Sequence, residues 1–186
     1  MELLILTGVL VLAIILALLS SLFVWWLVES FVLDAPFLPL PQPVVDRLVS
    51  KLPLAHDTTF YDLGCGDGRI LTALATSNPT VRFFGVEKAL IPSVWLRLKT
   101  KVGTKINKNL HFQRQDYRTV DLSRVDTVFM YLWPGAMTEL ERKCLEEMPP
   151  GSTVVVCRFP FPSLQPVQTE RIDYQGQSYR FFYYQL

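Results

Sequence analysis

The chain carries the stretch Tyr61-Asp62-Leu63-Gly64-Cys65-Gly66-Asp67-Gly68-Arg69. Before it, residues 58–61 favour an extended backbone, and after it residues 70–75 favour a helix with one apolar face. The stretch therefore predicts a strand, a glycine-rich turn and a helix, in that order. Glycines let the backbone turn tightly and bring its main chain close to a ligand, and the first turn of the helix offers unpaired N–H groups. We call residues 64–68 the glycine turn and predict that it binds a ligand.

The spacing within this stretch indicates the kind of ligand. A dinucleotide site usually reads G-x-G-x-x-G, whereas here Asp62 is followed by glycines at every second position. A carboxylate at the end of a first strand suits a ligand with an ammonium group better than it suits a pyrophosphate. We predict a binding role for Asp62, Gly64, Gly66 and Gly68. A glycine-rich turn without a ligand is the alternative.

Two further strands end in acids that suit the same ligand. Residues 81–86 form a predicted second strand that ends at Glu87, and ligands of doubly wound sheets bind outside the carboxyl ends of the strands. Glu87 can accept hydrogen bonds from two ribose hydroxyls. A third predicted strand, 110–115, is followed by Asp116 and Tyr117, which suit an adenine amine and an adenine ring. Strand-end residues exposed to solvent are the alternative for all three.

The remaining pattern predicts the fold class. Residues 127–132 are nearly all apolar, as in a parallel strand that is buried on both faces, and residues 153–157 form a fifth strand. Residues 167–174 and 177–184 flank Gly176 as an aromatic-rich hairpin. The sequence predicts an α/β fold, with a Rossmann-like doubly wound sheet that ends in an antiparallel hairpin and is preceded by one transmembrane helix.

Three amphipathic helices are predicted around this sheet, over residues 44–52, from Pro92 onward and over residues 137–148. In the last helix, one face is apolar and the other is charged. Its predicted buried residues are Met137, Leu140, Cys144, Leu145 and Met148. Its predicted charged face holds Glu139, Glu141, Arg142, Lys143, Glu146 and Glu147, with Glu139 and Lys143 as an i,i+4 pair.

The N-terminal stretch has no charged residue from Leu3 to Val28. As a helix, this stretch rises about 39 Å, enough to cross a hydrocarbon core of about 30 Å with some tilt. Trp25 and Trp26 fit the interfacial belt of a membrane span. A signal peptide or a buried core helix are the alternatives, but the acidic start at Glu2 is atypical of a signal peptide, and a core helix of this length usually has a polar face.

The predicted organisation is a transmembrane anchor over residues 1–33, a proline-rich linker over 34–43 and a catalytic domain over 44–186. The linker is either a stiff spacer or a segment that folds over the edge of the ligand site. All Lys and Arg residues follow the anchor, which favours a single-pass protein with its domain on the cytoplasmic, or matrix-equivalent, side of the bilayer.

Composition argues against several other classes of protein. The formal net charge of the 186 residues is only +1, which argues against a dedicated nucleic-acid binder. The three cysteines lack C-x-x-C spacing and only two histidines are present. We therefore expect neither a disulfide framework nor a metal site.

The stretch around Asp62 resembles motif I of the class I S-adenosylmethionine-dependent methyltransferases, whose cofactor carries an ammonium and a sulfonium group. The order of the segments is similar to that of the small membrane-anchored protein-lysine methyltransferases, which act on the ATP synthase c-subunit and the adenine nucleotide translocase and have prokaryotic relatives. The similarity covers about residues 35–170. It is carried by the N-terminal helix and by residues 37–41, 62–70, 131–134 and 158–162. It implies S-adenosyl-L-methionine as cofactor, and a lysine of a membrane protein as methyl acceptor.

Two positions depart from the pattern of these relatives. Leu40 stands where relatives tend to have Thr, and Lys88-Ala89 stands where they tend to have Asn-Pro or Asp-Pro. Both departures bear on the substrate more than on the cofactor.

Methyl transfer needs an unprotonated lysine in line with the sulfonium methyl group. Many amino-methylating relatives have an acidic or amide side chain after the fourth strand, where this chain reads Tyr131-Leu132-Trp133-Pro134. We predict that Tyr131, Trp133 and carbonyl groups near Pro134 form an apolar acceptor slot that lowers the lysine pKa by desolvation. Core packing of Tyr131 and Trp133 is the alternative.

Arg158 is the last predicted catalytic residue. It can hold the backbone or a carboxylate of the substrate, or pair with Asp116 or Glu87. Two other functions remain open from the sequence: a methyltransferase for a lipid, quinone or other small amphiphile, and a non-catalytic cofactor-binding protein. The intact set of Asp62, glycines and Glu87 argues against the second of these.

Overall fold

The computed structural model describes residues 1–32, 38–52, 54–89 and 108–186, without the side chains of residues 3, 4 and 26–32. The chain divides into two compact units, residues 1–36 and 37–186, and each is described by itself. The helix predicted from Pro92 onward lies outside the described residues, as does the side chain of Trp26.

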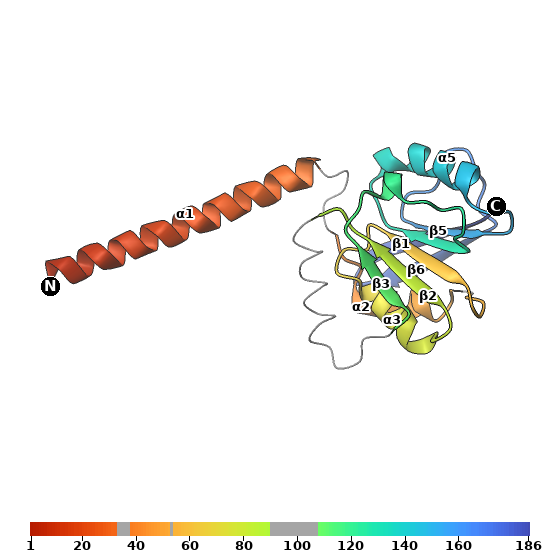
Figure 1. Cartoon of the computed structure of the whole chain (residues 1–186), viewed down its shortest axis with the longest axis horizontal. Coiled ribbons are helices and arrows are strands. Elements are labelled where there is room, and N and C mark those ends of the chain that lie inside the picture. The colour runs from red at the N-terminus through yellow and green to blue at the C-terminus, as the bar shows by residue number, and fades with distance from the viewer. Residues whose placement is uncertain (33–37, 53, 90–107) are drawn as a thin grey trace. The chain divides into compact units, whose positions relative to one another are not determined.

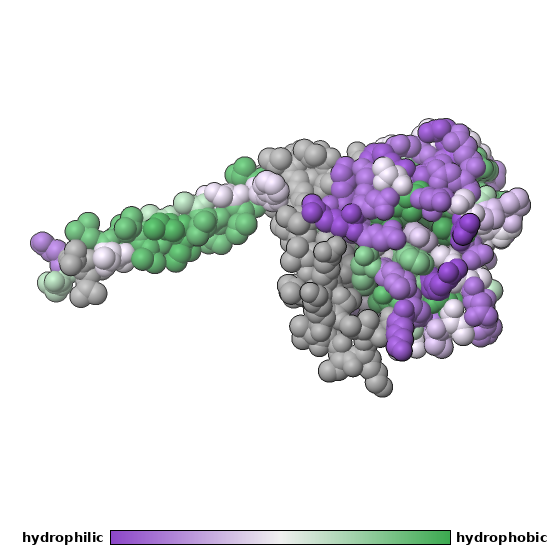
Figure 2. Space-filling model, in the orientation of Figure 1, coloured by the Kyte–Doolittle hydropathy of each residue, from purple (hydrophilic) through white to green (hydrophobic). Residues whose placement is uncertain are grey.

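The first unit contains one long helix, α1 (Glu2–Val32). Its described side chains are exposed and almost all apolar, and they cover most of the helix face seen in Figure 2. Over Ile5–Trp25 the helix is long and apolar enough to span a membrane. A signal sequence satisfies the same test of length and composition.

The second unit is built on a seven-stranded sheet of order β3-β2-β1-β4-β5-β7-β6 (Figure 1). The strands are β1 (Thr59–Leu63), β2 (Arg82–Val86), β3 (Leu110–Gln113), β4 (Thr127–Met130), β5 (Thr153–Cys157), β6 (Gln168–Tyr174) and β7 (Gln177–Gln185). The first five strands pair in parallel, and β7 and β6 add the antiparallel hairpin. The predicted fold class is therefore confirmed. The predicted third and fourth strands were each two residues too long, because the chain leaves the sheet after Gln113 and Met130.

Helices cover both faces of this sheet (Figure 1). Helices α2 (Gln42–Val49) and α3 (Arg69–Ser77) pack together over one face, where their apolar residues join Phe60, Phe83 and Phe129 in one core. Helix α5 (Met137–Glu147) lies over the other face, and two short 3₁₀ helices, η1 (Tyr117–Thr119) and η2 (Pro134–Ala136), follow β3 and β4.

The chain order of the strands reverses between β1 and β4, which pair directly. Ligands of doubly wound sheets bind outside the carboxyl ends of the strands at such a switch point. The glycine turn follows β1 there, and both Gly64 and Cys65 donate their N–H groups to the carbonyl oxygen of Val86, at 2.8 and 3.0 Å. These bonds fix the start of the turn against the end of β2.

The structure corrects the prediction for α5 in three respects. Glu141 and Lys143 are buried, although they were expected on the charged face, and Leu145 is exposed. The predicted pair of Glu139 and Lys143 is replaced by an ion pair of Lys143 with Glu147 at 2.6 Å, while Glu139 accepts a hydrogen bond from Arg118. The helical pattern gave the apolar face correctly apart from Leu145. It did not reveal that the loop after β5 packs over part of the charged face.

Candidate active site

The glycine turn has the backbone conformation that its sequence predicts. Gly64, Gly66 and Gly68 have φ angles of 78°, 55° and 69°, a left-handed region that other residues adopt only at a cost. Gly64 also has no room for a side chain, since a Cβ atom there would lie 2.6 Å from Cδ2 of Leu132. The turn therefore lies directly against the segment that follows β4.

Replacing Gly64 with alanine is expected to lower the free energy of unfolding by about 2 kcal/mol, because the left-handed φ and the close approach to Leu132 both oppose a side chain. Urea unfolding of the purified chain measures this. Gly176 of the hairpin also has a positive φ but open space around it, so its alanine variant is the matched control for the steric part. Equal losses in both variants would contradict the importance of the Leu132 contact.

Acidic side chains gather beside this turn. Asp62, at the end of β1, is only 2% exposed, and burial together with the charges of Glu87 and Asp67 raises its pKa well above the usual value. Glu87, directly after β2, accepts hydrogen bonds from the N–H groups of Gly66 at 2.9 Å and Ala89 at 2.8 Å. The structure therefore brings Asp62, Glu87 and the glycine turn together, as predicted. The neighbouring carboxyl groups of Asp62 and Glu87 favour a cationic ligand at this edge.

Arg69, the first residue of α3, connects the turn to the proline-rich segment. Its guanidinium donates to both carboxylate oxygens of Asp67, at 2.9 and 2.7 Å, and Nη1 donates to the carbonyl oxygen of Leu40 at 2.5 Å. Leu40 itself is 2% exposed, in the core shared by α2 and α3. Of the two expectations for the linker, this contact supports a segment that folds against the site. No role had been predicted for Arg69, whose only signal was its position after the turn.

Asp116 and Tyr117 lie after β3, and both already have partners. Burial alone raises the pKa of Asp116, but hydrogen bonds from Lys88 Nζ at 2.9 Å and from the N–H of Arg118 lower it below the usual value. The Tyr117 ring is buried, with the Arg118 guanidinium 4.7 Å from its centre. An adenine amine at Asp116 would therefore share the carboxylate with Lys88.

The predicted catalytic residues form a second group, after β4 and β5. Tyr131 and Arg158 are brought together, with Nη1 of Arg158 donating to the Tyr131 hydroxyl at 3.4 Å. The described ion pairs of Asp116 run to Lys88 and Arg118, not to Arg158. Trp133 is 49% exposed and its ring lies 6.1 Å from that of Phe159, which sequence reasoning had not singled out. An exposed indole argues against the core-packing alternative for Trp133.

The two groups meet at one edge of the sheet. The contact of Leu132 with Gly64 places the Tyr131–Pro134 segment beside the glycine turn. The site thus has an acidic side, suited to a cationic nucleotide, and an aromatic side with Tyr131, Trp133 and Phe159, suited to a cationic or apolar acceptor.

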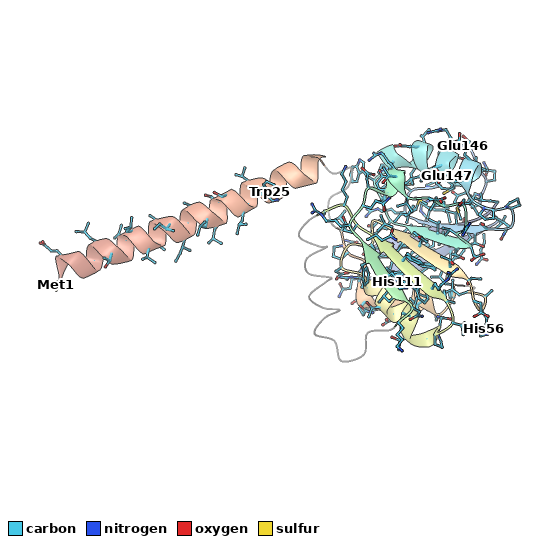
Figure 3. The ribbon with its side chains drawn as sticks, in the orientation of Figure 1. Met1, Trp25, His56, His111, Glu146 and Glu147 are labelled. Carbon is cyan, nitrogen blue, oxygen red and sulfur yellow. The ribbon has the colours of Figure 1, made fainter. Side chains whose placement is uncertain are left out.

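Among the described residues, no three or more His, Cys, Asp or Glu side chains are arranged so that they could hold a metal ion. His56 lies before β1 near Thr80, whereas His111 lies on β3 against Phe84 (Figure 3). The expectation that the chain needs no metal stays a prediction.

Comparison with known proteins gives the family. A family model described as the ANTKMT methyltransferase domain matches residues 62–168. The protein-lysine N-methyltransferase of Saccharolobus islandicus is 27% identical over 160 residues, 83% of this chain and 96% of that protein. The human lysine N-methyltransferase of the ATP synthase c-subunit is 29% identical over 140 residues, 74% of this chain and 58% of that protein. The present chain thus spans little more than half of the human relative.

Among solved structures, an RNA methyltransferase from Salinibacter ruber, in complex with S-adenosyl-L-homocysteine, has a TM-score of 0.69 and 27% sequence identity. The similarity covers 80% of this chain and 93% of that protein. The left-handed glycines and the buried acid of the present site have the chemistry to bind such a cofactor, and their binding role stays a prediction. The chain belongs to the ANTKMT methyltransferase-domain family and is an S-adenosyl-L-methionine-dependent methyltransferase.

Proposed function

We propose that this enzyme methylates a lysine of a membrane protein and that α1 anchors it in the same bilayer, with its catalytic domain on the cytoplasmic or matrix-equivalent side. The observation that carries the proposal is the exposed Trp133 beside Phe159, next to the acidic turn through the contact of Leu132 with Gly64. S-adenosyl-L-methionine, when bound, supplies an electrophilic methyl group. The remaining requirements fall on residues of this chain.

Asp62 and Glu87 have the chemistry to hold the cofactor. The buried carboxylate of Asp62 suits its ammonium group, and Glu87 can accept hydrogen bonds from the ribose hydroxyls while its other contacts hold it beside Gly66. Glycines 64, 66 and 68 let the main chain approach, and Asp116 and Tyr117 suit the adenine.

Tyr131, Trp133 and the carbonyl groups near Pro134 act on the lysine. An amine surrounded by aromatic rings loses hydration, which lowers its pKa, and the faces of the rings attract the ammonium form as it enters. Water then takes the proton, and the unprotonated nitrogen is aligned for in-line attack. Arg158, which is exposed and hydrogen-bonded to Tyr131, can bind a carbonyl or carboxylate group of the substrate.

The membrane part of the proposal rests on two supports. The Ile5–Trp25 stretch of α1 is apolar and long enough to span a bilayer. Related enzymes are named for the ATP synthase c-subunit as their target, which is itself a membrane protein. An anchored enzyme meets such a target at the membrane surface.

The test uses the full chain in lipid vesicles that contain the purified ATP synthase c-subunit, together with tritiated S-adenosyl-L-methionine. Methyl-lysine in the hydrolysed protein supports the proposal, and a c-subunit variant with its lysines changed to arginine is the control. Label found only in lipid or quinone would instead favour the small-amphiphile alternative. Cofactor binding without transfer to any component would favour a non-catalytic role.

A further inference from the structure

Glu141 of α5 is a buried acid that the reaction described above does not use. It is only 4% exposed, and its hydrogen bonds run to the loop between β5 and β6 (residues 158–167). Its two carboxylate oxygens accept the N–H of Ser163 at 3.1 and 3.2 Å, and Oε1 also accepts the N–H of Leu164 at 2.5 Å. A carboxylate is tolerated in a protein interior when such bonds replace its hydration, and bonds to a charged acceptor are among the strongest. Glu141 therefore fixes the middle of this loop.

The start of the same loop has a strained backbone. Arg158 has a φ of 74°, and the N–H of Phe159 donates to the carbonyl oxygen of Cys157 at 3.0 Å, which closes a three-residue γ-turn. A residue other than glycine keeps this conformation only where its surroundings enforce it, and such residues are concentrated at functional sites. The N–H of Arg158 also donates to the carbonyl oxygen of Arg180, at 2.7 Å.

A second anchor lies between the γ-turn and the contacts of Glu141. The N–H of Phe161 donates to the hydroxyl of Tyr184 at 2.9 Å, and the two rings lie 4.8 Å apart in the core. The loop is thus held at Arg158 by β7, at Phe161 by Tyr184 and at residues 163–164 by Glu141. Among the contacts given for these three anchoring points, none involves the glycine turn.

The γ-turn presents two side chains to the acceptor side of the site. Arg158 reaches the Tyr131 hydroxyl, and the Phe159 ring faces Trp133 at 6.1 Å. The Arg158 guanidinium also lies 5.8 Å from the centre of the Phe159 ring. Phe159 and Arg158 therefore complete the slot whose other side is formed by Tyr131 and Trp133.

We infer that Glu141 is a positioning residue for the methyl acceptor: it holds the β5–β6 loop in the shape that places Phe159 and Arg158 against Trp133 and Tyr131. The inference rests on the proposed function, because it assumes that these four residues receive the lysine. Asp62 and Glu87 lie on other elements, so loss of Glu141 changes acceptor binding and leaves cofactor binding unchanged.

The experiment compares Glu141→Gln and Glu141→Ala with Glu146→Gln in the full chain. Glu146 is the matched control because it lies on the same helix, exposed, and among the described residues its ion pair is with Arg142, one turn earlier (Figure 3). With the ATP synthase c-subunit in vesicles as acceptor, Glu141→Gln is expected to raise the acceptor KM about tenfold, the effect of losing one hydrogen bond to a charged group. Glu141→Ala raises it further, and Glu146→Gln leaves it unchanged.

Two further readouts separate positioning from general stability. Hydrogen exchange should show faster exchange of the Ser163 and Leu164 amides in Glu141→Gln, while kcat and the Kd for S-adenosyl-L-homocysteine stay within about twofold. Tyr184→Phe removes only the hydroxyl that accepts the Phe161 N–H, and it should also raise the acceptor KM. Because this variant keeps Glu141, it tests the role of the loop even if the Glu141 variants misfold.

Three outcomes would overturn the inference. Faster exchange at residues 163–164 with an unchanged KM would show that the loop does not serve the acceptor. Parallel losses in kcat, cofactor affinity and melting temperature would show a structural role only. If the unmodified chain bound cofactor but labelled no lysine, the proposed function would fail first, and this inference with it.

Discussion

Replacing Asp62 with asparagine is expected to abolish useful cofactor affinity and, at the same time, to make the cofactor-free protein more resistant to heat. The buried carboxylate stands beside Glu87 and Asp67, and burial and these charges raise its pKa. Its ionised form therefore opposes folding at neutral pH when no cation is bound. Removing the charge removes that cost, but it also removes the proposed partner for the ammonium group of the cofactor.

The expected loss of affinity is about 100-fold or more, because removing one member of a buried charge pair costs about 2–5 kcal/mol. The expected gain in melting temperature is about 2 °C or more, the shift that about 1 kcal/mol produces in a domain of this size. Calorimetric titration with S-adenosyl-L-homocysteine and thermal unfolding with and without it measure both. Asp57→Asn, at an exposed position before β1, is the matched control.

The pH dependence of this effect has a definite sign. An acid whose pKa is raised by folding stabilises the folded state below its unfolded pKa, about 3.9, and that stabilisation is lost as the pH rises through the folded value. The advantage of Asp62→Asn should therefore be largest near neutral pH and should shrink on acidification. Unchanged cofactor affinity in this variant would remove Asp62 from the site, and a lower melting temperature at neutral pH would contradict the electrostatic argument.

The acidic side of the site could be predicted from the sequence because its acidic residues lie at the ends of predicted strands. Asp62 and Glu87 each follow a short apolar run, and the carboxyl ends of neighbouring parallel strands must lie at one edge of a sheet. The glycine spacing then added the left-handed turn that the structure contains. Local pattern and the rules of parallel sheets were sufficient for these residues.

Other features depend on contacts between distant segments, which no local pattern contains. Glu141 belongs to a charged run on α5 and was assigned to the exposed face, but it bonds amides more than 20 positions later. Lys88 was noted only as a departure from relatives, and its pairing with Asp116 follows from the adjacency of β2 and β3. Phe159 belongs to the stretch 158–162 that carries the family resemblance, but its place beside the exposed Trp133 follows only from the structure. Such contacts can be recognised only when the segments after β2, β3, β4 and β5 are placed in the fold.

Replacing Trp133 with alanine is expected to lower kcat/KM for a lysine acceptor about 100-fold while the Kd for S-adenosyl-L-homocysteine stays unchanged. The indole is half exposed and is proposed to form one wall of the acceptor slot, so its loss should leave the core intact but both misplace and rehydrate the lysine. Steady-state kinetics with the ATP synthase c-subunit in vesicles and calorimetric titration of the cofactor product measure the two effects separately. Trp133→Phe, which keeps an aromatic face, should retain much of the activity.

The pH profile distinguishes the loss of a desolvated slot from a simple loss of contact. If Trp133 lowers the pKa of the bound lysine by excluding water, kcat should rise with pH in both proteins, and the rise should occur at higher pH in Trp133→Ala. If the profile keeps its position on the pH axis and only the rates are lower, Trp133 aligns the acceptor without changing the lysine pKa. Leu145→Ala, which truncates an exposed apolar side chain of α5 away from the proposed slot, is the control for general surface effects. Wild-type turnover in Trp133→Ala would show that the acceptor lysine binds elsewhere. The aromatic residues Tyr131, Trp133 and Phe159 beside the glycine turn would then need another explanation.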